Sequence, residues 1–314
     1  NTDKEGAFST DVPIRVPGKY EVSFTDAKGF IGTRIIIAPG CYDAFTALLI
    51  EQAGFGCAYV SGASIAFTRL GRPDIGLTTL TEVAETVGNI RDRVSLPLIV
   101  DGDNGFGNAL NVQRTVRLLE KMGASAIQLE DQTLPKRCGH LEGKTLISTA
   151  EMLGKLRAAQ DARTDPATAI VARTDAIAVD GFEAGLERAH RYAEAGADVL
   201  FVEALRTPEQ MARVGRELGG RVALLANMVE GGKTPLLSIA ELGEIGFRLA
   251  IFPGAMVRVV GFAASQYLAT LKGEGTTRNM LDRMFDFSRL NVTVGTEAML
   301  QAGEQYAAER MKKP

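Results

Sequence analysis

Eight short apolar runs, each followed by a segment with helical periodicity, constrain the fold of this chain more than any other feature. The runs are rich in β-branched residues and almost continuously apolar, as strands buried on both faces should be. They span residues Ile35–Ala38, Ala58–Ser61, Leu96–Asp101, Ala126–Leu129, Ile170–Arg173, Val199–Glu203, Ala223–Asn227 and Leu249–Phe252. Eight strand–helix repeats predict an α/β protein with a (β/α)8 (TIM) barrel, and a doubly wound open sheet is the alternative.

The segments around these runs set the expected domain organisation. Amphipathic patterns lie between the runs, and several end at a glycine that directly precedes the next run, as in AGFG, MGAS, AGAD and IGFR. Residues 255–272 are typical of the eighth barrel helix, and residues 277–290 carry a further helical pattern. We therefore expect an N-terminal arm over residues 1–33, and one barrel domain with a C-terminal helical extension over residues 34–314.

Composition excludes several classes of protein. The 314 residues carry 35 Lys and Arg against 38 Asp and Glu, so the net charge of −3 gives no reason to expect a nucleic-acid partner. No apolar run reaches the roughly 18 residues that a membrane span needs. Three scattered cysteines and two histidines disfavour a disulfide scaffold and a His-rich zinc site. A small-molecule enzyme in a reducing, cytoplasmic compartment is the expectation that remains.

Polar residues gather where the predicted strands end, which in a barrel is the face that carries the active site. The set contains one hydroxyl, four carboxylates, one guanidinium and one amide: Ser61, Asp101, Asp103, Glu130, Glu203, Arg173 and Asn227. Carboxylates crowded in a poorly solvated mouth repel one another unless a cation or protons relieve them. The pattern predicts a Mg²⁺ or Mn²⁺ ion held by Asp and Glu, partly through water.

Residues 100–108, VDGDNGFGN, are the densest part of this set. The segment fits neither an EF-hand loop, since position five is Gly105 and position twelve is Val112, nor a dinucleotide loop, since the third glycine is absent. A simple turn at Asn104 and Gly105 explains the segment equally well. Metal binding by Asp101 and Asp103 therefore competes with a purely structural turn.

Residues 129–144, LEDQTLPKRCGHLEGK, form a second unusual segment. A lone cysteine is more often a small buried apolar residue than a reactive one. Cys138, however, lies between the basic pair Lys136–Arg137 and Gly139–His140, surroundings that lower the pKa of a thiol and suit it to proton transfer. Gly139 would also allow a mobile loop that closes over a substrate.

Taken together, these segments resemble the isocitrate lyase/phosphoenolpyruvate mutase superfamily over residues 35–290. The resemblance rests on ordered matches to APGCYDA, YVSGAS, GRPDIGL, VDGDNGFGNALNVQRTV, IQLEDQTLPKRCGH, VARTDA, FVEAL, LANMVEGGKTP and IFPGAMVR. The Lys-Arg-Cys-Gly-His loop is the mark of the carbon–carbon bond lyases in that superfamily. The family also exchanges its eighth helices between paired subunits, which implies a homotetramer built from helix-swapped dimers.

The resemblance implies a role for each matching position. It implies Mg²⁺ near Asp101 and Asp103, with Glu130, Asp74 and Glu203 acting through water. Substrate contacts would come from the residues Ser61, Gly62, Ala63, Gly139, His140, Arg173, Asn227, Pro253 and Arg258. Cys138 would be the acid that protonates carbon, with Tyr59 as the base and Lys136, His140 and Arg173 as further catalytic groups.

The implied reaction is retro-aldol cleavage of a 2-hydroxy dicarboxylate, such as 2,3-dimethylmalate, to pyruvate and a carboxylic acid. Cleavage of 2-methylisocitrate is the alternative, which Arg258 keeps open. An oxaloacetate hydrolase or decarboxylase, and a non-catalytic metabolite-binding barrel, are further alternatives, and Pro253 argues against the hydrolase because those enzymes carry Ser there. Two other positions depart from the family pattern: Ala63 replaces a glycine, and Asn104 stands beside the metal pair.

Overall fold

The computed structural model describes residues 14–16, 20–22, 35–139 and 141–310 of the chain. Contacts group the chain into two compact units, Asn1–Val257 and Arg258–Pro314, and each is described by itself below. Within the predicted arm, the structure describes a short antiparallel pair, β1 (Ile14–Val16) and β2 (Tyr20–Val22). The rest of the predicted arm lies outside the described residues.

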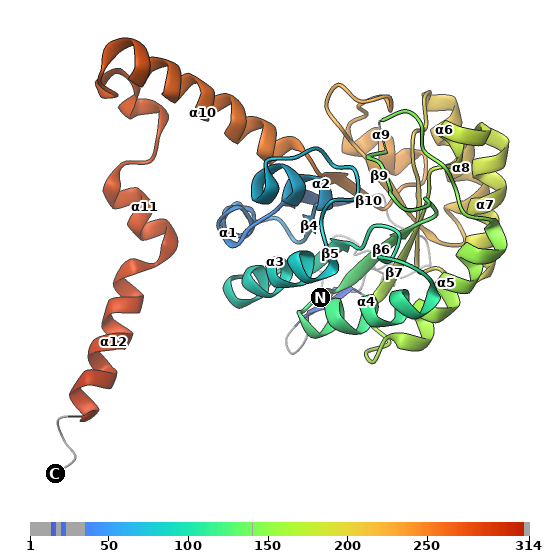
Figure 1. Ribbon diagram of the computed structural model, residues 1–314, viewed down its shortest axis with the longest axis horizontal. Coiled ribbons are helices and arrows are strands. Elements are labelled where there is room, and N and C mark those ends of the chain that lie inside the picture. The colour runs from blue at the N-terminus through green and yellow to red at the C-terminus, as the bar shows by residue number, and fades with distance from the viewer. Residues whose placement is uncertain (1–13, 17–19, 23–34, 140, 311–314) are drawn as a thin grey trace, which may run out of the picture. The chain divides into compact units, whose positions relative to one another are not determined.

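Eight parallel strands close into a barrel in the first unit, with helices around it (Figure 1). The strands are β3 (Ile36–Cys41), β4 (Ala58–Val60), β5 (Leu98–Asp101), β6 (Ala126–Glu130), β7 (Ala169–Thr174), β8 (Val199–Val202), β9 (Ala223–Asn227) and β10 (Leu249–Phe252). The last strand pairs with the first, with Leu249 opposite Ile36 and Phe252 opposite Pro39. This closure confirms the predicted (β/α)8 barrel and shows that the open-sheet alternative was wrong.

The strands are apolar throughout because both of their faces are buried, as their composition predicted. Side chains that point inward fill the barrel, among them Tyr59, Ile99, Val171 and Phe201, each at most 2% exposed. The alternate residues pack outward against the helices in a larger cluster. A filled interior leaves the chemistry to the end of the barrel where polar residues replace apolar ones.

Helices follow the strands around the barrel (Figure 1). Those of the first unit are α1 (Ala44–Gln52), α2 (Gly62–Ile65), the π-helix η1 (Ala66–Leu70), α3 (Leu80–Arg93), α4 (Ala109–Lys121), α5 (Thr149–Ala162), α6 (Ala176–Asp180), α7 (Phe182–Glu194), α8 (Pro208–Leu218) and α9 (Ile239–Glu244). Side-chain caps fix many of their starts: Asp43, Thr79, Asn108 and Ser238 each form a capping box with the third helical residue. These caps satisfy amides that would otherwise lack partners, and so determine where each strand-to-helix loop ends.

The second unit is helical. The helix α10 (Ala255–Glu274) leads into it and ends at Gly275, whose φ of 65° is the left-handed conformation that stops a helix. A 3-10 helix, η2 (Arg278–Arg283), is followed by α11 (Phe287–Val294) and α12 (Thr296–Arg310). The continuous helix expected over 277–290 is therefore broken, because the Asp286 carboxylate caps a new helix by accepting from the Arg289 amide at 2.6 Å.

Candidate active site

The turn after β5 brings two carboxylates to the mouth of the barrel. The Asp103 amide donates to Asp101 Oδ1 at 3.2 Å, and the Asp103 carbonyl accepts from the Glu130 amide at 2.9 Å. Asp103 has a φ of 47°, an uncommon conformation for a residue with a side chain. This strained turn holds Asp101, Asp103 and the end of β6 together, as the strand-end pattern predicted.

Lys136 enters this acidic group from the loop after β6. Its Nζ lies 2.5 Å from Asp74 Oδ1 and 2.6 Å from Asp103 Oδ1, and all three side chains are at most 5% exposed. Sequence reasoning had placed Lys136 among the catalytic groups. In the structure its charge lies between two of the predicted metal ligands.

The acidic group has more negative than positive charge, and the pKa values reflect this. Burial, together with Asp101 and Asp74, raises the pKa of Asp103 to about 7 although Lys136 opposes the shift. Burial also raises the pKa of Glu130 well above its usual range, against the effect of Arg173. Glu130 Oε1 has no hydrogen-bond partner among the described residues, so one buried carboxylate oxygen is free to receive a cation or a proton.

These residues fit a hydrated divalent cation. Among the residues that the structure describes, no three His, Cys, Asp or Glu side chains converge as a metal-binding group. Magnesium sites need only one or two carboxylates, since the ion keeps several waters. Asp101 and Asp103 supply two such carboxylates, and the free oxygen of Glu130 could accept a hydrogen bond from a water on the ion. Gly62 leaves room beside them, because a Cβ there would lie 3.0 Å from Asp101 Oδ2.

A second charged group lies at the end of β7 and is balanced. Arg173 donates to Asp175 through Nε at 2.9 Å and NH2 at 3.1 Å, and Lys144 Nζ lies 2.9 Å from the same carboxylate. Burial alone would raise the pKa of Asp175, but Arg173 and Lys144 lower it below its usual value. The Asp175 amide donates in turn to Asp131 at 2.9 Å.

Arg173 links the two groups. Its NH1 lies 3.4 Å from Glu130 Oε2, its NH2 lies 3.7 Å from Glu203 Oε2, and its guanidinium lies over the Phe201 ring at 5.0 Å. Asn227 donates to Glu203 at 2.9 Å, while Asn227 Oδ1 has no partner among the described residues. The predicted residues from β6 to β9 are therefore brought to one place.

The predicted carboxylate-binding segment follows β4 on the same face. The Gly62 amide donates to Asp101 Oδ2 at 3.3 Å, and Ser61 caps the short helix α2 by accepting from the Ser64 amide at 3.2 Å. Ser64 Oγ also donates to the Pro253 carbonyl at 3.0 Å, which places the end of β10 beside this helix. Ala63 lies within α2 and is half-buried.

The loop that carries Cys138 lies on the mouth of the barrel. The Cys138 amide donates to the Asp74 carbonyl at 3.1 Å. A Cβ on Gly139 would lie 2.5 Å from Arg173 NH2 and 3.0 Å from Glu203 Cγ, so the backbone there touches both residues. His140 is outside the described residues, and Arg258 belongs to the second unit, so the expected roles of both stay predictions.

Tyr59 lies deeper in the barrel than the other predicted groups. Its hydroxyl donates to Gln128 Oε1 at 2.8 Å, and Gln128 Nε2 donates to Asp101 Oδ1 at 3.0 Å. Burial, with Asp101 next, raises the pKa of Tyr59 well above its usual value. The structure thus gives Tyr59 a supporting contact to the acidic group, which the sequence did not suggest.

Sequence reasoning missed the residues that hold the site in place: Gln128, Asp131, Lys144, Lys155 and Asp175. Lys155 is 3% exposed and donates to the Asn104 carbonyl at 2.9 Å, directly behind the Asp103 turn. Asp131 and Asp175 carried a usable signal, since each directly follows the end of a strand. Gln128 lies within a strand, Lys155 within a helix and Lys144 at the end of a loop, and nothing in the local sequence distinguishes these three.

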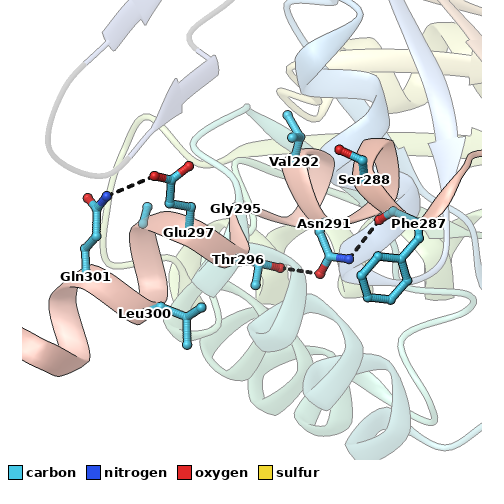
Figure 2. Close-up of a pocket in the computed structure, with 10 residues that line it drawn as sticks. Phe287, Ser288, Asn291, Val292, Gly295, Thr296, Glu297, Leu300 and Gln301 are labelled. Atoms are coloured by element: carbon cyan, nitrogen blue, oxygen red, sulfur yellow. Dashed lines mark hydrogen bonds between the residues drawn. The ribbon is translucent and has the colours of Figure 1, made fainter.

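The second unit contains a different kind of hollow. Figure 2 shows it between α11 and α12, where Asn291 donates to the Phe287 carbonyl at 2.8 Å and accepts from Thr296 at 2.8 Å. Its lining includes the exposed apolar side chains Phe287, Val292 and Leu300 and a single carboxylate, Glu297. With one ionisable group, this hollow lacks the acid–base pairs found at the barrel mouth.

Comparison with known proteins places this geometry in a family. The profile described as phosphoenolpyruvate phosphomutase matches residues 31–272. The chain is 43% identical over 277 residues to a 2,3-dimethylmalate lyase from Eubacterium barkeri, covering 88% of this chain and 95% of that one. It is 47% identical over 279 residues to a 2-methylisocitrate lyase from Aeropyrum pernix, covering 89% and 87%.

Solved structures agree with the sequences. A structure of oxaloacetate acetylhydrolase in complex with the inhibitor 3,3-difluorooxalacetate matches with a TM-score of 0.83 at 33% identity, covering 88% of this chain and 93% of that one. No helix among the described residues is long and apolar enough to cross a membrane. The chain belongs to the phosphoenolpyruvate mutase/isocitrate lyase superfamily, and it is a carbon–carbon bond lyase of that superfamily.

Proposed function

We propose that the chain is a Mg²⁺-dependent lyase that cleaves a 2-alkylmalate, such as 2,3-dimethylmalate, to pyruvate and a carboxylic acid. The observation that carries the proposal is the contact of Gly139 with Arg173 and Glu203. It puts the loop of the neighbouring Cys138 over the same mouth that holds the surplus carboxylates. The 43% identity to a 2,3-dimethylmalate lyase supports the choice of substrate.

Asp101 and Asp103 would hold Mg²⁺, and Glu130, Asp74 and Glu203 would act through water. Mn²⁺ has the same preference for oxygen ligands and would be accepted. When bound, the ion lowers the pKa of the substrate 2-hydroxyl and neutralises the adjacent carboxylate. The raised pKa values of Asp103 and Glu130 support this assignment, because both carboxylates lack enough positive charge without it.

The remaining groups would bind and orient the substrate. The backbone amides of Ser61, Gly62 and Ala63 would donate to the carboxylate next to the 2-hydroxyl. Arg173 would bind the oxygens of the same substrate carboxylate and of the 2-hydroxyl. Asn227, whose Oδ1 has no partner among the described residues, would meet the second carboxylate together with Gly139 and His140.

Bond cleavage would follow removal of the proton from the 2-hydroxyl. The C2–C3 bond breaks as the oxygen becomes the 2-oxo group, and the electron pair stays on C3 as a carboxylate-stabilised carbanion. The Cys138 thiol then acts as a general acid and gives its proton to C3. The dianion formed on the way needs donors and cations around it, and Arg173, Lys136 and His140 would supply them.

The base that removes the hydroxyl proton is proposed to be Tyr59. Its hydroxyl donates to Gln128, whose amide donates to Asp101, and Tyr59→Phe distinguishes a base from a residue that only supports this contact. In Tyr59→Phe, loss of a general base lowers kcat by about 10² to 10⁴-fold. A fall of tenfold or less would show that Tyr59 only supports Gln128 and Asp101.

The alternative substrate is 2-methylisocitrate, which carries a third carboxylate. Arg258 would meet that group, and the 47% identity to a 2-methylisocitrate lyase favours this reading. Oxaloacetate hydrolysis is less favoured, although an oxaloacetate acetylhydrolase shares the fold. Pro253 offers no side-chain hydroxyl at the position where those hydrolases carry Ser.

The test is release of 2-oxo acid with Mg²⁺ from 2,3-dimethylmalate, 2-methylmalate, 2-methylisocitrate, isocitrate and oxaloacetate. Pyruvate from the alkylmalates is expected, and Cys138→Ser should lower its release by several orders of magnitude without changing the fold. Cys57→Ser removes a buried thiol outside the site and is the matched control. Release of 2-oxo acid from 2-methylisocitrate alone would identify this tricarboxylate as the substrate. Normal turnover by Cys138→Ser would refute the role of the thiol.

We also propose that the chain forms a homotetramer of helix-swapped dimers in a reducing, cytoplasmic compartment. Many large apolar side chains of the second unit are exposed, including Phe262, Phe287, Val292 and Met299 at 67%, 87%, 77% and 75%. Apolar exposure on this scale marks a protein–protein contact, and a second copy of the chain would cover it. The three free thiols suit a reducing compartment. Light scattering that gives a monomer would refute the assembly.

A further inference from the structure

Lys144 is a buried cation that the proposed reaction does not use. Its side chain is 1% exposed, and it lies five residues beyond Gly139, at the C-terminal side of the Cys138 loop. A buried ammonium is costly unless it is both paired and hydrogen-bonded. The structure provides both, because Lys144 Nζ donates to the Gly139 carbonyl and pairs with Asp175 at 2.9 Å.

The partner of Lys144 is held rigidly by other residues. The Asp175 carboxylate accepts two hydrogen bonds from Arg173, and its backbone amide donates to Asp131. Asp131 is itself fixed, since it accepts from Thr174 at 2.7 Å and from Tyr192 at 2.8 Å. Lys144 is therefore attached to the same carboxylate that orients Arg173.

The other partner of Lys144 is the backbone next to Cys138. Gly139 touches Arg173 and Glu203, so a shift of its carbonyl would move both the cysteine and the contact with the substrate-binding arginine. A hydrogen bond from a charged donor to a carbonyl is stronger than one between neutral groups. Lys144 thus holds the loop at Gly139, where a displacement would move both Cys138 and the contact with Arg173.

We propose that Lys144 is a positioning residue that holds the Cys138 loop on the barrel mouth, by joining the Gly139 carbonyl to the Asp175–Arg173 pair. The inference rests on the proposed lyase function, in which the loop delivers a proton. It makes closure of the loop and orientation of Arg173 depend on one carboxylate. Release of Lys144 would therefore let the loop open while the barrel stays folded.

A second ion pair on the same loop provides a contrast. Glu142 pairs with Lys233 of the segment after β9, but the Glu142 side chain is 86% exposed. Exposed pairs are screened by salt and contribute little. The buried tie through Lys144, and not this surface pair, is expected to control the position of the loop.

The test compares Lys144→Met with Lys144→Arg and with Lys233→Met in the full chain. Two readouts are taken: steady-state turnover of 2,3-dimethylmalate and 2-methylisocitrate, and the rate at which iodoacetamide alkylates Cys138, identified by peptide mass. A displacement of about 1 Å costs on the order of 10²-fold in rate. For Lys144→Met we therefore expect kcat about 10²-fold lower, and alkylation at least about tenfold faster because the loop opens.

Lys144→Arg, which keeps the charge and the donors, should restore most of kcat and slow the alkylation again. Lys233→Met should match the wild type in both readouts. A lower melting temperature for Lys144→Met with unchanged Cys138 alkylation would overturn the proposal, because it would show a purely structural lysine. If the wild type cleaves neither substrate but Lys144→Met still speeds alkylation, the proposed function fails while the tie to the loop stands.

Discussion

Asp103 and Asp175 are both buried carboxylates at the barrel mouth, and each lies beside a buried lysine. Their pKa values nevertheless move in opposite directions. Asp103 shares Lys136 with Asp74 and has Asp101 nearby, so its pKa rises to about 7. Asp175 lies beside two cations, Arg173 and Lys144, so its pKa falls despite burial. Burial is common to the two, and the count of neighbouring charges makes the difference.

The comparison separates the part of the mouth that works on substrate from the part that supports it. Around Asp103, four carboxylates face one lysine and one edge of Arg173, which leaves negative charge for a metal ion. Around Asp175, two cations meet one carboxylate, so no negative charge is left over there and the group forms a rigid frame. A surplus of like charge is costly to folding, and its presence in a folded protein points to a functional site.

The largest expected effect on stability comes from removing the carboxylate that Arg173 and Lys144 share. Asp175→Asn leaves Arg173 and Lys144 buried without their shared carboxylate, and losing one partner of such a pair costs about 3–5 kcal/mol. Urea titration should show the free energy of unfolding falling by that amount. The control is Glu183→Gln, which removes an exposed partner of Arg213 and should change little. If Asp175→Asn is as stable as the wild type, the group formed by Asp175, Arg173 and Lys144 does not stabilise the mouth of the barrel.

A smaller effect on stability should follow when a metal ion neutralises the surplus negative charge around Asp103. Mg²⁺ at a hundred times its Kd should stabilise the wild-type chain by about 2.7 kcal/mol relative to EDTA. Asp103→Asn should lose most of this gain, because a carboxylate ligand is gone. Thermal unfolding with and without Mg²⁺ measures both, and an equal gain in the two proteins would place the ion elsewhere.

The raised pKa of Asp103 predicts a pH dependence with a definite sign. The folded state binds this proton more tightly than the unfolded chain does, so the contribution to stability is present below about pH 4 and is lost as the pH rises through about 7. In EDTA, the stability of Asp103→Asn relative to the wild type should therefore increase as the pH rises across this window. The check is the free energy of unfolding of both proteins at pH 4, 6 and 8. The same pH dependence in the two proteins would contradict the assignment.

The smallest expected effect concerns reactivity and leaves stability unchanged. Cys138 is half-buried, whereas Cys41 and Cys57 are fully buried. Burial raises the pKa of the Cys57 thiol to about 12 and raises that of Cys41 further. Iodoacetamide at pH 8 should label Cys138 alone, as read by peptide mass. Labelling of Cys57 in the folded protein would show that the barrel opens more than its packing indicates.

Much of the site was predictable because barrel topology brings strand ends together. Asp101, Glu130, Arg173 and Asn227 were placed by their positions at the ends of apolar runs, and the structure brings them to one mouth. Tyr59 shows the limit of this reasoning. Its place in the chain suggests the mouth, but its hydrogen bond to Gln128 depends on β6, which lies two strands away from β4 around the barrel.

The sequence by itself determined the barrel, because eight doubly buried strands separated by capped helices have few other ways to pack. It also determined which residues reach the mouth, since these follow each strand in order. Only the tertiary structure decided how the charges are shared. Lys136 lies in sequence near Arg137 and Lys144, yet it faces Asp74 and Asp103, while Lys144 faces Asp175. Pairings over such separations depend on three-dimensional distance, and they distinguish a site with surplus charge from a balanced frame.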